Sequence, residues 1–116
     1  MKREIALRWI EALRDPSTKQ TQGRLGKPDG SRCCLGVLCD VMGVPFYKCG
    51  GMVAKLEGPG ITVLPRIVQE LADMASPNGE LGNRTLDNLD NLAIMNDNGA
   101  SFTEIADIIE QNWEKL

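Results

Sequence analysis

The sequence contains no histidine, and this absence excludes more chemistry than any other feature of the chain. Histidine is the commonest general base and metal ligand, and it is one partner in every Ser-His or Cys-His nucleophilic pair. Aromatic residues are also few, with two Trp, one Tyr and two Phe, so the core must consist mainly of aliphatic side chains. We therefore expect a protein that binds a target and catalyses no reaction.

The four cysteines do not have the spacing of a metal site. Cys33, Cys34, Cys39 and Cys49 form no Cys-x-x-Cys pair, and no histidine is present to replace a thiolate ligand. Buried, reduced thiols in an apolar segment are the simpler interpretation. We predict that the protein binds neither a metal ion nor a cofactor.

Acidic residues offer the remaining route to catalysis. Asp87 and Asp90 lie one helical turn apart, with Asp97 nearby, which leaves a metal-dependent nuclease as an alternative. Carboxylates at this spacing more often form a solvated helix face. We therefore keep the enzymatic interpretation only as an alternative.

The chain lacks an apolar run near the length of a membrane span. Its first residues are interrupted by charges and do not resemble a secretory signal. With 116 residues it has the size of one domain, which we place at 1–116. We expect a cytosolic protein.

The apolar pattern predicts a mainly helical α+β fold, with about four to five helices and one or two short β-hairpins. Residues 33–42 fit a buried strand or a buried helix, and we favour a helix that ends at Gly43. Residues 17–32 form either a hairpin or an ordered loop, and residues 50–64 form a hairpin. The other predicted helices cover 2–14, 65–74, 85–95 and 101–115.

For two of these helices the sequence also predicts how the helix begins and which side chains are buried. Pro65 can open a helix, and Ser101 with Glu104 forms a capping box at the start of the last one. In the helix after Pro65 we expect four side chains to face inward: Ile67, Val68, Leu71 and Met74. In the last helix we expect five to be buried: Phe102, Ile105, Ile108, Ile109 and Trp113.

Residues 92–107 resemble a helix-turn-helix only superficially. The second helix would present Thr103, Glu104, Asp107 and Glu110 to DNA, and these carboxylates repel phosphates. We expect an ordinary helical hairpin and no nucleic-acid binding.

Charge is divided unevenly along the chain. Residues 1–66 contain 11 Lys or Arg and 6 acids, whereas residues 67–116 contain 2 bases and 10 acids. The two halves then either attract each other within the fold, or the first half carries an anion site. Both interpretations remain open.

A basic, polar segment provides the candidate anion site. Its charged and neutral donors suit a compact anion such as a nucleotide phosphate. Trp9 or Tyr47 would stack on the base if either borders the pocket. The alternative is a solvated surface loop with Trp9 in the core. The residues that we expect to contact phosphate are Lys19, Gln20, Gln22, Arg24 and Arg32.

Several strings occur together in a recognisable order. They are WIEALR at 9–14, QGRL at 22–25, CCLGVLCD at 33–40, LP at 64–65 and the segment 92–110 with its NDxGxSFxEIAD pattern. In this order they resemble a family of small proteins in tailed-phage and prophage genomes. The resemblance runs over nearly the whole chain and implies a phage accessory protein, acting in the cytoplasm of an infected bacterium. It carries over no catalytic or binding residue.

The resemblance also suggests what such a protein does. One class of small phage proteins sequesters the nucleotide signals of bacterial immune systems, commonly as homo-oligomers with pockets at subunit boundaries. Our leading expectation is sequestration of a nucleotide-derived signal, of cyclic nucleotide or ADP-ribose type, which counters host anti-phage defence. The alternative is an inhibitor that binds a host protein through the acidic C-terminal helix.

Overall fold

The computed structural model describes residues 1–27, 29–44, 64–81 and 91–116. Five α-helices and one 3-10 helix occur in these ranges, and no strand does. None of these helices has the length and apolarity needed to cross a lipid bilayer. The hairpin predicted at 50–64 lies, apart from Leu64, outside the described residues. The helices are α1 (Arg3–Arg14), α2 (Cys34–Val41), α3 (Arg66–Ala72), α4 (Leu92–Asp97), α5 (Phe102–Asn112) and the 3-10 helix η3 (Trp113–Lys115).

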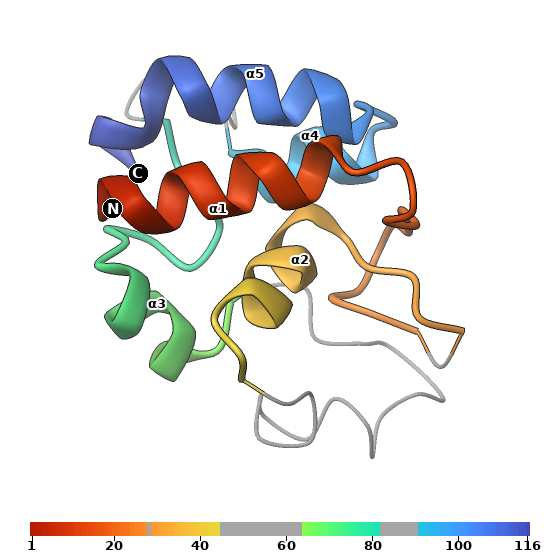
Figure 1. Cartoon of the computed structure of the whole chain (residues 1–116), viewed down its shortest axis with the longest axis horizontal. Coiled ribbons are helices and arrows are strands. Elements are labelled where there is room, and N and C mark those ends of the chain that lie inside the picture. The colour runs from red at the N-terminus through yellow and green to blue at the C-terminus, as the bar shows by residue number, and fades with distance from the viewer. Residues whose placement is uncertain (28, 45–63, 82–90) are drawn as a thin grey trace.

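Helices α1 and α5 lie side by side and antiparallel, and they form the most extensive helix pair of the fold (Figure 1). Each buries one apolar stripe at helical spacing, as the sequence predicted. The two ends of the chain meet beside this pair, where the Met1 ammonium donates to the Leu116 carbonyl at 2.6 Å. The buried side chains of the pair are Ile5, Ala6, Trp9, Ile10, Leu13, Phe102, Ile105, Ala106 and Ile109.

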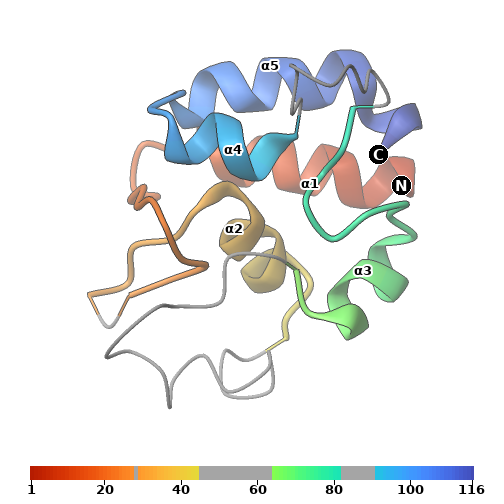
Figure 2. The same ribbon diagram turned by 180° about the vertical axis from the view of Figure 1, so that it is seen from behind.

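Helix α2 packs against α1 and α4, and the view from behind shows α4 beside it (Figure 2). Its residues 34–39 are all buried, because this apolar segment has neighbours on every side. The helical alternative for residues 33–42 is therefore confirmed. Gly43 follows with a left-handed φ of 68°, and its N–H donates to the Asp40 carbonyl at 3.0 Å. This is the glycine-terminated end that the sequence predicted.

The segment 17–32 is an ordered loop, and the hairpin alternative is not supported among its described residues. Only isolated bridges occur in it, joining Gln20 and Gly26 to Arg32. Backbone hydrogen bonds from Thr21 N to Arg32 O (2.8 Å) and from Cys33 N to Leu25 O (3.1 Å) close the loop. It therefore holds a defined shape without a β-ladder.

Helix α3 buries only part of the face that was predicted to point inward, with Val68 buried as expected. Val68 and Ala72 are fully buried, whereas Ile67 and Leu71 are 50% and 45% exposed. Both pairs have i, i+4 spacing, and in a helix of seven residues either pair can form the inner face. The prediction for Ile67 and Leu71 was wrong, while Met74, which follows the helix, is buried as expected.

Helices α4 and α5 both begin at a side-chain cap. The Asn91 side chain accepts from Ile94 N at 2.9 Å, and the Ser101 hydroxyl accepts from Glu104 N at 3.2 Å. Gly99, with a left-handed φ of 98°, follows the C-cap of α4. Helix α4 begins at Leu92, and residues 85–90 of the longer predicted helix lie outside the described ranges. In the last predicted helix, Ile108 and Trp113 are only partly buried.

Candidate functional site

A buried asparagine organises the region that the sequence marked as an anion site. Asn96 is fully buried, and its Oδ1 accepts from Gln20 Nε2 at 2.9 Å and from Cys34 N at 3.1 Å. Its Nδ2 donates to the Thr21 carbonyl at 2.8 Å. Because one side chain joins α4 to the loop and to the start of α2, we call this junction the Asn96 seam. In the sequence, Asn96 is evident only as the first residue of the NDxGxSFxEIAD string.

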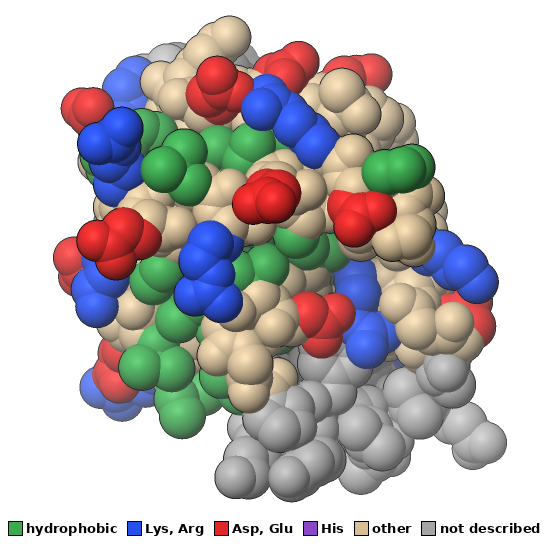
Figure 3. Space-filling model, in the orientation of Figure 1, with side chains coloured by type: hydrophobic (Ala, Val, Ile, Leu, Met, Phe, Trp, Pro, Cys, Tyr) green, Lys and Arg blue, Asp and Glu red, His purple; other side chains and the backbone are tan. Residues whose placement is uncertain are grey.

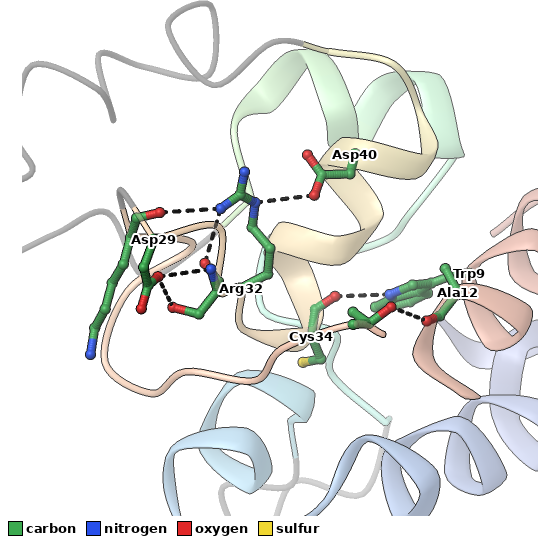
Figure 4. Close-up of polar contacts among 9 residues, drawn as sticks. Trp9, Ala12, Asp29, Arg32, Cys34 and Asp40 are labelled. Atoms are coloured by element: carbon green, nitrogen blue, oxygen red, sulfur yellow. Dashed lines mark hydrogen bonds and ion pairs between the residues drawn. The ribbon is translucent and has the colours of Figure 1, made fainter. Parts of the chain in front are cut away.

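Two of the predicted phosphate-contacting residues serve this internal structure instead. Gln20 donates its amide to Asn96 and to the Ala100 carbonyl, the latter at 2.7 Å. Arg32 pairs with Asp40 on α2 at 3.1 Å and donates to the Ser31 carbonyl at 3.0 Å (Figure 4). Its side chain is only 18% exposed. In this arrangement both residues are occupied by protein groups.

Trp9 lies in the core and has no exposed surface. Its indole N–H donates to the Cys34 carbonyl at 2.8 Å, which joins α1 to α2 (Figure 4). A ring with no exposed face cannot stack on a ligand, so the stacking role predicted for Trp9 is wrong. The alternative interpretation, a core tryptophan, holds.

The remaining predicted residues lie around the loop. Lys19 and Gln22 are exposed, and Arg24 is half-buried and makes contacts of its own. Tyr47 lies outside the described residues. Hydrogen bonds from Ser31 lower the pKa of Asp29, and the charges of Lys19 and Lys27 each add a smaller lowering effect. The loop thus carries a small cationic surface.

The CCLGVLCD string is explained by packing. A Cβ on Gly36 would lie 1.9 Å from the Leu25 carbonyl oxygen, so only glycine lets the loop approach α2. Burial raises the pKa of the Cys33 thiol to about 11 and that of Cys34 well above its ordinary value. Such thiols are poor nucleophiles and poor metal ligands. No group of His, Cys, Asp or Glu among the described residues is arranged to hold a metal ion.

Two shallow grooves lie along α1. A groove of about 630 Å³ is lined by Leu7, Ile10, Glu11, Arg14 and Asp15. A second groove of about 290 Å³ lies on the α2 side of the helix and shares Glu11 and Asp15 with the first. None of the predicted site residues lines either groove.

The charges around the larger groove are unequal. Arg14 on α1 pairs with Asp107 at 2.8 Å and also with Glu110, both on α5. This contact is an ion pair between the basic half and the acidic half of the chain. Glu11 makes no ion pair within the described part of the chain, and Asp15 accepts from Ser17 N–H and Oγ–H. Four carboxylates therefore surround one guanidinium.

We call this surface the outer face: Leu7, Ile10, Glu11, Arg14 and Asp15 of α1 with Asp107 and Glu110 of α5. Figure 3 shows acidic, basic and apolar side chains mixed along α1 and α5 on the side toward the viewer. Leu7 is 53% exposed although it is aliphatic. The signal that could have revealed it is a leucine on the charged side of a helix whose apolar stripe is already complete.

One family model matches almost the whole chain. Residues 1–113 match a family model described as a domain of unknown function (DUF8296). The chain belongs to this family. Comparisons with curated proteins and with solved structures found no match. Membership of DUF8296 assigns no activity, so the surface chemistry must carry the functional conclusion.

Proposed function

We propose that this DUF8296 protein is a non-catalytic, phage-encoded inhibitor that binds a host protein at the outer face. The observation that carries the proposal is Leu7, a half-exposed leucine in a groove bordered by carboxylates. An apolar side chain within a polar rim is the usual composition of a protein-binding surface. The phage setting comes from the resemblance of the sequence motifs to phage and prophage proteins.

The acidic C-terminal helix contributes differently from the way the sequence suggested. Its apolar stripe is buried against α1, and Asp107 and Glu110 are partly used in holding Arg14. The contact surface that we propose therefore includes α1 as well as α5. Both helices lie in the best-packed part of the fold, which provides a rigid platform for docking.

Affinity capture from a lysate of a bacterial host tests this function. We expect a host protein to be retained by the native chain, lost with Leu7→Arg, and retained with Ile67→Arg, whose side chain is equally exposed on α3. The captured protein is then purified and its activity measured with and without the native chain. Capture that is indifferent to Leu7→Arg, or a captured protein whose activity is unchanged, would contradict the proposal.

Sequestration of a nucleotide-derived immune signal is the second candidate. The observation in its favour is that Lys19, Gln22 and Lys27 are all exposed on one loop, where both lysines act on the Asp29 carboxylate. A panel of cyclic nucleotides and ADP-ribose compounds should raise the Tm if this candidate is correct. The ligand should be released chemically unchanged on heating, and Lys19→Ala with Lys27→Ala should remove the shift.

The two candidates also differ in assembly. Pockets at subunit boundaries require a homo-oligomer, and we propose such an assembly only together with nucleotide sequestration. Light scattering on the purified chain measures the mass directly. A monomer that shows no shift with any nucleotide would leave protein binding at the outer face as the remaining candidate.

A further inference from the structure

The shape of the outer face restricts what can dock there. From Leu7 to Asp15 the groove follows α1 for about 12 Å, since a helix rises about 1.5 Å per residue. This is the length of about two turns, and partner helices bind such grooves through anchors at i, i+3 or i+4, and i+7. The described residues contain no strand, so they offer no sheet edge to which an extended peptide could add.

The charges of the outer face restrict the partner further. Hydrogen bonds to Asp107 and Glu110 occupy the Arg14 guanidinium and raise its pKa. A hydrogen bond from the Ser17 backbone N–H, together with one from its hydroxyl, lowers the pKa of Asp15 and keeps it ionised. Glu11 lies between the two grooves and shares its carboxylate with both. The surface around Leu7 is therefore apolar at its centre, and its border carries four carboxylates against two guanidiniums, those of Arg14 and of Arg8 in the adjoining groove.

On this basis we infer that the outer face receives a cationic amphipathic helix of the partner, with an apolar side chain beside Leu7 and Lys or Arg side chains against Glu11 and Asp15. The inference rests on the proposed function, because it names the chemistry of the host segment bound there. Contact between an exposed leucine and a partner side chain supplies affinity, while the carboxylates select for positive charge and speed encounter. An acidic or purely polar helix would meet repulsion or leave Leu7 in water.

Three synthetic peptides provide the test against the full chain. The first is a Leu/Lys helix with one apolar face, the second is its Leu/Glu counterpart, and the third is a scrambled Leu/Lys sequence without an apolar face. Binding is measured by the anisotropy of a dye on each peptide. We expect only the first to bind, with an affinity that falls as salt is raised.

Variants of the chain locate the binding. Leu7→Ser and Glu11→Lys should each lower the affinity for the Leu/Lys peptide by about tenfold or more. The matched controls lie on α3: Leu71→Ser, a leucine of similar exposure, and Glu70→Lys, an exposed acid. Both controls should bind within about twofold of the native chain, since surface changes away from the contact have small effects. Circular dichroism confirms that each variant is folded.

Several results would overturn the inference. They are equal affinity for the Leu/Glu peptide, equal affinity for the scrambled peptide, binding that is indifferent to Leu7→Ser, and occupation of the outer face by a second copy of the chain. A host protein whose capture depends on Leu7 but which no Leu/Lys peptide displaces would leave the function standing and reject the cationic helix. Peptide binding that depends on Leu7, without any host protein that does, would support the helix chemistry and reject the function.

Discussion

The Asn96 seam and the outer face differ in whether their polar groups are hydrogen-bonded within the chain or exposed to other molecules. In the seam, every polar atom of Asn96 has a partner within the chain, and no part of the residue is exposed. On the outer face, the Glu11 carboxylate and half of the Leu7 side chain remain available to other molecules. The seam contains parts of the CCLGVLCD and NDxGxSFxEIAD strings, but the outer face also takes Ile10, Glu11 and Arg14 from WIEALR and Asp107 from NDxGxSFxEIAD. The exposed Leu7 lies outside every string, so the recognisable strings alone do not mark the surface that we propose for binding.

The largest effect should follow from Gly36→Ala in the seam. The added Cβ overlaps the Leu25 carbonyl at 1.9 Å, and backbone on both sides limits relaxation. We expect a loss of about 3 kcal/mol in the free energy of unfolding, at the upper end for overpacking, even after about 1 kcal/mol of improved helix propensity. Urea unfolding measures the difference.

Gly99→Ala is the matched control for this change. Gly99 has a left-handed φ of 98° and no atom within 4 Å of an added Cβ, so its replacement tests backbone strain without overlap. We expect a loss of about 1 kcal/mol. Equal losses at Gly36 and Gly99 would mean that the approach of the loop to α2 is not tight.

Asn96→Ala should have the next largest effect. It leaves the Thr21 carbonyl, Cys34 N–H and Gln20 amide without this partner in a buried place. A loss of about 2 to 3 kcal/mol is expected, because unsatisfied buried groups lose their hydration without compensation. Asn98→Ala is the control, at the exposed C-cap of α4 two residues after Asn96. It should change the free energy of unfolding by less than about 0.5 kcal/mol. A small loss at Asn96 would indicate that water readily replaces its amide.

The buried thiols predict a decline in stability at high pH. The Cys33 thiol has an ordinary pKa of 9.0 when unfolded and a pKa of about 11 in the fold. Between these values the unfolded chain releases a proton that the folded chain retains, so stability is intact below pH 9 and falls as pH rises toward 11. Cys33→Ser, which cannot ionise in this range, should show a shallower decline in Tm. The same slope in both proteins would contradict a buried thiol.

On the outer face, Leu7→Ser should change stability little. The residue is already 53% exposed, and we expect a change within about 0.5 kcal/mol by urea unfolding. Leu13→Ser, on the same helix but 2% exposed, should lose about 3 kcal/mol or more, because the core loses an apolar side chain and gains an unpaired hydroxyl. Similar losses at the two positions would mean that Leu7 is a structural residue.

The sequence predicted those parts of the fold that depend on near neighbours. The apolar stripes of α1 and α5 and the glycine end of α2 were all evident, since each depends on spacing within one helix. The roles of Asn96 and Gln20 were not, because their partners in the seam lie 62 to 80 positions away in the chain. The short helix α3 offered two equivalent i, i+4 faces, and only tertiary packing decides between them.

The candidate site was harder to predict for the same reason. Among the described residues, two of the positive charges that lie close together in the sequence are paired within the fold, since Arg32 pairs with Asp40 and Arg14 pairs with α5. The sequence shows how many charged side chains a segment contains, but only the folded structure shows which of them form ion pairs within the protein. An aliphatic residue on a charged helix face was the more informative signal for the outer face.

The smallest effect should come from Asp15, at the border of the outer face. Ser17 donates to its carboxylate through both backbone N–H and hydroxyl, and these bonds hold its pKa below the ordinary 3.8. The contribution to stability is therefore present above pH 3.8 and is lost as pH falls through the lower, folded value. We expect Asp15→Asn to lower the Tm slightly at neutral pH and to match the native chain in strong acid, because both side chains are then neutral. A Tm difference that persists unchanged into acid would show that Asp15 acts through its shape alone, and the outer face would lose one of the ionised carboxylates on which its preference for a cationic partner depends.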